Sequence, residues 1–161
     1  MDLAMKVFFL RHGDAGDPEK WKGDDAERPL SAEGRERTTL EARALAAMRF
    51  KLDVMLTSPL LRARQTAMIV AETLNLGVND DERIVDIDAR KLQDILKDHR
   101  DVDAIMLVGH EPSMSETISR VIGGGEVELK KGGLACFEVR ESDSSRGRLL
   151  WLLPPKLLVD K

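Results

Sequence analysis

One short segment near the start constrains the fold of this chain more than any other. Residues 7–10 are β-branched, aromatic or aliphatic, which is typical of a buried strand, and Arg11, His12 and Gly13 follow directly. In an open α/β sheet, ligands bind in the crevice outside the carboxyl ends of the strands. A cation and a histidine delivered there, with a glycine that lets the backbone turn sharply, are placed to bind an anion. The alternative is that Arg11 and His12 are only polar residues at a strand exit.

Two later segments repeat this pattern. A predicted strand over residues 53–57 is followed by Arg62, and a nearly all-apolar strand over residues 104–108 is followed by Gly109 and His110. The carboxyl ends of parallel strands meet at one edge of a sheet. We therefore expect four side chains to lie together at that edge: Arg11, His12, Arg62 and His110. The agreement of three strand ends favours an anion site over chance.

The rest of the chain alternates between predicted helices and strands. The helices are expected at residues 32–48, 59–75, 89–97 and 112–122, and the remaining strands at 83–87, 134–140 and 148–153. Ser31 and Ser58 are expected to cap the first two helices, with Pro59 at the first position of the second. This alternation predicts a three-layer α/β/α sandwich with a mostly parallel sheet. No repeat or linker divides the chain, so we expect residues 1–161 to form a single domain.

Composition narrows the classes of partner. The net charge of −4 argues against a nucleic-acid partner, whose phosphates need a basic face, although an acidic protein can still hold a local cationic pocket. Cys136 is the single cysteine, which fits a reducing compartment. No apolar run has the length of a signal peptide or of a membrane span, so we expect a cytoplasmic protein with no membrane partner.

Three motifs together carry a resemblance to a known family. The Arg-His-Gly triplet at 11–13, the Ser-Pro-x-x-Arg-Ala-x-Gln-Thr segment at 58–66 and the Gly-His pair at 109–110 resemble the histidine phosphatase superfamily, which also contains the cofactor-dependent phosphoglycerate mutases. The short chain and the Arg-Pro-Leu-Ser-Ala-Glu-Gly segment at 28–34 resemble its small SixA-type phosphohistidine phosphatase branch. The resemblance runs from about Val7 to about Val139 and implies a phosphoglycerate mutase-like fold.

Phosphoryl transfer gives the four residues definite roles. Catalysis of this reaction is mostly positioning plus positive charge, and the planar fork of an arginine matches phosphate oxygens. We assign Arg11 and Arg62 to a clamp and His12 to the attacking nucleophile, as the resemblance also implies. His110 is expected to donate to the same oxygens, and to be protonated when phosphate is bound. A backbone carbonyl near Gly13 is expected to fix the tautomer of the nucleophile.

Other candidate residues surround this set. Arg28 is expected to reach the mouth of the pocket and, with Gly13, to bind the phosphate. Ester hydrolysis needs a general acid, and Asp86 and Asp88, at the end of the predicted 83–87 strand, are candidates because they share one face if this segment is extended. The alternative is that both are solvated, and Glu111 and Asp14 are more remote candidates. Glu111 stands where the family leads us to expect asparagine, which changes the expected polarity of the pocket.

Neither a metal nor a cofactor is expected, because the three histidines are scattered and lack carboxylates at ligand spacing. The preferred function is a metal-independent phosphatase acting on phosphohistidine in a protein, such as a histidine phosphotransfer domain. The alternatives are a phosphatase of small sugar or aryl phosphate esters, and a non-catalytic phosphate-recognition module. A mutase is disfavoured because the chain between Thr66 and Val102 is too short to close a pocket around two phosphates.

Overall fold

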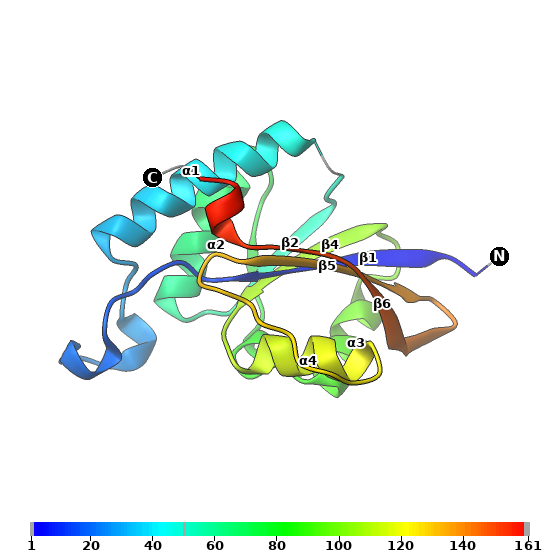
Figure 1. Ribbon diagram of the computed structural model, residues 1–161. Coiled ribbons are helices and arrows are strands. Elements are labelled where there is room, and N and C mark those ends of the chain that lie inside the picture. The colour runs from blue at the N-terminus through cyan, green and yellow to red at the C-terminus, as the bar shows by residue number, and fades with distance from the viewer. Residues whose placement is uncertain (1, 50, 160–161) are drawn as a thin grey trace.

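Six strands form one mixed sheet in the computed structural model, which describes residues 2–49 and 51–159 (Figure 1). Their order across the sheet is β3-β2-β4-β1-β5-β6. The strands are β1 (Ala4–Arg11), β2 (Val54–Thr57), β3 (Asn79–Asp80), β4 (Ala104–Gly109), β5 (Leu134–Arg140) and β6 (Asp143–Leu153). β1, β2, β3 and β4 pair in parallel, whereas β5 is antiparallel to both of its neighbours. The predicted three-layer α/β fold with a mostly parallel sheet is confirmed.

The strand register brings the predicted site residues to one edge. Arg11 lies opposite Gly109 in the β1–β4 pair, and Thr57 lies opposite Val108 in the β2–β4 pair. The carboxyl ends of β1, β2 and β4 are therefore level with one another. Every residue of β4 is buried, as expected for a strand between two parallel neighbours and two helix layers.

Helices cover both faces of the sheet. In Figure 1, α1 (Ala32–Met48) and α2 (Leu61–Leu74) lie on one side and α3 (Ala89–Asp98) and α4 (Ser113–Val121) on the other. Successive residues of β1 point to opposite faces: Phe8 packs in the cluster under α1 and α2, and Phe9 in the cluster under α3 and α4. Within the described residues, no helix combines the length and the apolar character that a membrane span requires.

The predicted edge strand at 83–87 is wrong. The strand at this edge is the short β3, and the chain then forms a 3₁₀ turn, η3 (Glu82–Ile84). The cause is Asp81, whose carboxylate accepts hydrogen bonds from the backbone N–H and the guanidinium of Arg83. A side chain that bonds to nearby backbone in this way competes with a strand ladder.

The second helix begins later than predicted. α2 starts at Leu61, so Ser58 and Pro59 lie in the connection from β2 rather than in the first turn. The Ser58 hydroxyl accepts from the Leu60 N–H at 3.2 Å, and it also contacts His110. β6 is longer than the predicted strand at 148–153, because its pairing with β5 continues past two register shifts to Asp143.

Candidate active site

The four residues predicted to converge do come together. Arg11 ends β1 with His12 directly after it, His110 follows β4, and Arg62 lies in the first turn of α2. The His12 and His110 rings are 5.2 Å apart between centroids. The backbone N–H of His12 donates to the carbonyl of Gly109 at 3.0 Å, which ties the two strand exits together. The positive charges of both arginines act on both imidazoles.

The hydrogen bond of His12 fixes its tautomer. Nδ1 lies 2.7 Å from the carbonyl oxygen of Gly13; because a carbonyl only accepts, Nδ1–H donates, as predicted. Nε2 is then left with its lone pair in the neutral ring. Burial lowers the pKa of His12 to about 3, and the charges of His110, Arg62 and Arg11 add to this effect. At neutral pH the ring is therefore neutral, with its lone pair on Nε2.

His110 is held by the end of β2. Its Nε2 lies 2.7 Å from the hydroxyl oxygen of Ser58, and its Nδ1 is buried with no hydrogen-bond partner among the described residues. Burial, followed by the charge of Arg62, lowers the pKa of His110 to about 4. An anion placed between the rings would oppose both effects and favour the protonated form.

Both arginines are anchored through one side of the guanidinium. Arg11 donates from Nη1 to the carbonyl of Leu129 at 3.0 Å. Arg62 donates from Nη1 to the backbone carbonyl of Asp25 at 2.8 Å and from Nη2 to its carboxylate at 3.0 Å. The Nε atoms of both are buried without a partner in the described structure. A buried donor without an acceptor costs about 1–3 kcal/mol, a cost that a bound oxyanion would remove.

Arg28 lies at the site, and Asp25 is a residue that the sequence reasoning missed. Arg28 is buried and donates from Nε to the Asp25 carboxylate at 3.0 Å and from Nη1 to the carbonyl of Ala15 at 2.8 Å. Asp25 thus bridges Arg28 and Arg62. The hydrogen bond from Arg28 lowers the pKa of this carboxyl most. No local pattern separates Asp25 from the other acidic residues of the 14–29 loop.

Two further missed residues belong to the Ser-Pro-x-x-Arg-Ala-x-Gln-Thr motif. The Thr66 hydroxyl accepts from the N–H of Gly13 at 3.1 Å and donates to the carbonyl of Arg62 at 2.8 Å. Gln65 accepts from the N–H of Leu30 at 2.8 Å. Their helical spacing after Arg62 was the available signal. Gly13 itself has no room for a side chain, because an added Cβ would lie 2.6 Å from the hydroxyl oxygen of Thr38.

The two predicted candidates for a general acid lie away from these contacts. Asp88 caps α3 by accepting from the N–H of Lys91 at 2.8 Å, and the carbonyl of Asp86 accepts from Nζ of the same lysine. Both residues are exposed, and in the described part of the chain no hydrogen bond or ion pair joins either of them to the site. The carboxylate of Asp14 is nearer, but hydrogen bonds from Ser31 and Lys131 lower its pKa to about 2.

Comparisons with known proteins agree with this geometry. The family model described as the histidine phosphatase superfamily (branch 1) matches residues 7–103. An uncharacterised protein of Picosynechococcus sp. is 34% identical over 96% of this chain and 99% of its own length. The phosphohistidine phosphatase SixA of Escherichia coli is 39% identical over a shorter stretch, 45% of this chain and 43% of SixA.

Solved structures extend the likeness to the whole chain. The protein histidine phosphatase SixA complexed with tungstate is 25% identical, with a TM-score of 0.85 over 96% of this chain and 100% of that one. A mycobacterial glucosyl-3-phosphoglycerate phosphatase has the same fold at 16% identity, with a TM-score of 0.71 over 91% of this chain and 97% of its own.

Proposed function

This chain belongs to the histidine phosphatase superfamily, and we propose that its phosphatase activity passes through a phosphorylated His12 and acts on phosphohistidine in a protein. The observation that carries the proposal is the hydrogen bond from Nδ1 of His12 to the carbonyl of Gly13. It leaves a neutral imidazole with its lone pair on Nε2, which is what an attacking nucleophile needs.

In the first step, Nε2 of His12 attacks phosphorus in line with the leaving group. The new N–P bond forms as the bond to the leaving group breaks, and the guanidinium groups of Arg11 and Arg62 hold the equatorial oxygens. The unpartnered Nε atoms of both arginines and Nδ1 of His110 support this role, because oxyanions supply the acceptors that these atoms lack. The charge of Arg28 also acts on His110, and the shared contact with Asp25 places Arg28 beside Arg62.

In the second step, water attacks the phosphorus of phosphorylated His12. The N–P bond breaks, its electron pair returns to Nε2, and inorganic phosphate leaves. The same arginines serve both steps, because the charge on the phosphoryl oxygens is similar in each. His110 is protonated while the phosphoryl group is bound and gives the oxygens a charged donor.

The leaving group favours phosphohistidine over an ester. An alkoxide needs a proton as it departs, whereas an imidazole already protonated on its other nitrogen leaves as a neutral molecule. Two carboxyl groups in the 14–29 loop beside the site are poor acids: the pKa of Asp14 is about 2, and that of Asp25 is also lowered. Because this site lacks a good general acid, we expect it to cleave a phosphoramidate faster than an ester.

The lengths of the loops around the site also favour a protein substrate. β2 and β4 pass into α2 and α4 through the short connections 58–60 and 110–112, so these two strand ends carry no long loop. The longer segments 12–31 and 122–133 lie at the site, the second through the contact of Leu129 with Arg11. An open pocket holds a small substrate by little more than its phosphate. A protein substrate adds binding energy from outside the pocket.

The alternative substrate is a small phosphate ester, since the fold is shared with a phosphatase of glucosyl-3-phosphoglycerate. The test measures kcat/KM for a histidine-phosphorylated phosphotransfer domain, a sugar phosphate and an aryl phosphate. We expect the phosphorylated domain to give the highest value. A sugar phosphate that is better by about tenfold or more, which is about 1.4 kcal/mol in transition-state binding, would overturn the substrate assignment.

A further inference from the structure

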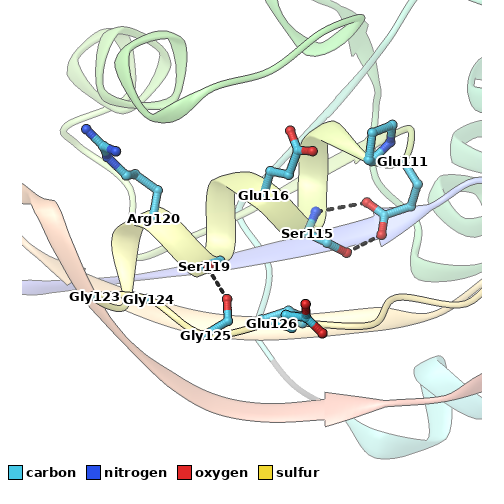
Figure 2. Close-up of a pocket in the computed structure, with 11 residues that line it drawn as sticks. Glu111, Ser115, Glu116, Ser119, Arg120, Gly123, Gly124, Gly125 and Glu126 are labelled. Atoms are coloured by element: carbon cyan, nitrogen blue, oxygen red, sulfur yellow. Dashed lines mark hydrogen bonds between the residues drawn. The ribbon is translucent and has the colours of Figure 1, made fainter.

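A groove outside the phosphate pocket runs along α4. It encloses about 790 Å³ between one face of the helix and the segment 123–127, which returns beside it (Figure 2). We call this hollow the α4 groove. It is lined by Glu111, Pro112, Ser115, Glu116, Ser119, Arg120, Gly123, Gly124, Gly125, Glu126 and Val127. The mechanism proposed above uses none of these residues.

Both walls of the α4 groove lead to the phosphate pocket. The helix wall begins at Glu111, the residue after His110. The other wall continues from Val127 to Leu129, whose carbonyl accepts the hydrogen bond from Nη1 of Arg11. A chain lying in the groove therefore runs beside the segments that lead to His110 and to the contact with Arg11.

The charge of the α4 groove is opposite to that of the pocket. Three carboxylates line it against a single guanidinium: Glu111, Glu116, Glu126 and Arg120. Glu111 accepts hydrogen bonds from the N–H and hydroxyl of Ser115, as Figure 2 shows. Glu116 and Glu126 are exposed, and within residues 2–49 and 51–159 neither has an ion-pair partner. The candidate active site, in contrast, holds three arginines, Arg11, Arg28 and Arg62, with the Asp25 carboxylate between two of them.

Part of the wall opposite the helix, residues 123–125, is bare backbone. Gly123, Gly124 and Gly125 have φ angles of 98°, 126° and 91°, and a Cβ on any of them would meet nothing within 4 Å. Glycine is therefore required at these positions by the backbone conformation, which other residues rarely adopt, and not by a lack of space. Ser119 donates to the carbonyl of Gly125 and ties this wall to α4 (Figure 2). The groove is free of side chains along these three glycines, which leaves width there for an extended chain.

We propose that the α4 groove binds a basic segment next to the phosphohistidine of the protein substrate, with lysine or arginine side chains facing Glu116 and Glu126. This inference rests on the proposed function and adds the class of substrate sequence. A negative phosphoryl group beside positive residues matches a cationic pocket beside an acidic groove. Such complementarity sets specificity more than raw affinity. The same carboxylates repel a free, doubly negative sugar phosphate approaching along the groove.

The test compares two phosphohistidine peptides that differ only in their flanking residues, lysines in one and glutamines in the other. Phosphoimidazole, which does not reach the groove, reports the basal activity. We expect wild-type kcat/KM to be about fivefold higher for the lysine peptide, as two exposed ion pairs of about 0.5 kcal/mol each imply. The double variant Glu116→Gln, Glu126→Gln should lose this preference through KM and keep its rate on phosphoimidazole.

A matched control carries the same change in charge elsewhere. Glu72→Gln with Glu141→Gln removes two exposed carboxylates outside the groove and the pocket, and should keep the preference. A preference that survives in the Glu116, Glu126 variant, or that the control also loses, overturns the proposal.

A binding measurement separates this proposal from the proposed function. Fluorescence anisotropy of the unphosphorylated, labelled peptides reports on the groove even if the enzyme turns over neither phosphohistidine peptide. We expect the lysine peptide to bind wild type more tightly than the glutamine peptide, with a difference that falls as salt rises. Equal affinities for wild type would refute the groove proposal, whatever the substrate is.

Discussion

At the scale of single residues, the proton on Nδ1 of His12 decides what this site can do. Its acceptor is the carbonyl of Gly13, and the N–H of Gly13 is in turn held by Thr66 on α2. In the proposed mechanism, the nucleophile is thus positioned by backbone that Thr66 of α2 holds in place, rather than by a carboxylate. The arginines supply the charge, and their own anchors leave donors free.

Replacing Arg62 by lysine should lower kcat/KM by about 100-fold or more, although the charge is kept. A lysine cannot reproduce the planar fork that holds both the Asp25 carboxylate and the phosphoryl oxygens. Arg64→Lys is the matched control, because Arg64 lies on the same helix and pairs with Asp80 away from the histidines. Steady-state kinetics on a phosphohistidine substrate checks both variants. Near-wild-type values for Arg62→Lys would show that a point charge is enough.

Glu41 gives a prediction on stability. Its side chain on α1 is 5% exposed, and its carboxylate packs against Gly132, where an added Cβ would lie 2.6 Å from Oε1. The N–H of Gly132 is shared between the carbonyls of Arg11 and His12, so this carboxyl lies behind the catalytic segment. Burial raises the pKa of Glu41 from 4.5 to about 7, against the opposing charge of Arg37.

Because the pKa of Glu41 is higher in the folded protein, its contribution to stability is fully present below about pH 4.5 and is lost as pH rises through about 7. The loss is about 3 kcal/mol at most. Glu41→Gln should therefore remove this part of the pH dependence and be more stable than wild type at pH 8. Urea unfolding between pH 5 and pH 8 measures it, with the exposed Glu36→Gln on the same helix as control. Parallel pH profiles for wild type and Glu41→Gln would contradict the account.

At the scale of elements, Asp88 is expected to act as a helix cap rather than as an acid. Asp88→Ala should cost about 1 kcal/mol of unfolding free energy, the usual value for a lost N-cap, whereas Asp86→Ala should cost much less. Urea denaturation measures the difference. Neither change should alter the ratio of rates on phosphohistidine and aryl phosphate. A selective loss on the aryl phosphate would restore one of these carboxyls as the general acid.

The strand ends were predictable because their signal is local. An apolar run followed by Arg-His-Gly or Gly-His marks both the strand and the edge at which its ligand residues lie. The strand predicted at 83–87 was wrong because the deciding residue lies outside the segment. Its apolar residues suit a strand, but the Asp81 side chain bonds to Arg83 and stabilises a 3₁₀ turn instead. Asp25 was out of reach because its role comes from two arginines, one of them 37 residues away in the chain.

At the scale of the whole molecule, an acidic protein holds a strongly cationic pocket. The net charge is −4, yet three arginines converge where the strands end. In the proposed function, this contrast favours anion binding among the arginines, and the charge of the α4 groove has the opposite sign. The short connections after β2 and β4 are the feature on which the proposal of a protein substrate rests.

The arginines should make the reaction independent of divalent metal. Within the described residues, no group of three or more histidine, cysteine or acidic side chains gathers as a metal site would require. We expect kcat/KM on a phosphohistidine substrate to be unchanged after dialysis against EDTA. Activity that is lost on chelation and returns with magnesium would show that a metal helps to bind the phosphoryl oxygens, the role assigned to Arg11 and Arg62.

The transfer of the phosphoryl group to His12 is the central claim, and trapping that intermediate tests it most directly. Enzyme quenched during turnover of a radiolabelled substrate should carry an acid-labile, base-stable phosphoryl group, mapped by mass spectrometry to His12. His12→Ala should stay folded by circular dichroism, trap no label and lose turnover, whereas His99→Ala, altered at the end of α3, should behave as wild type. Undiminished turnover by His12→Ala, or label on another residue, would contradict the account.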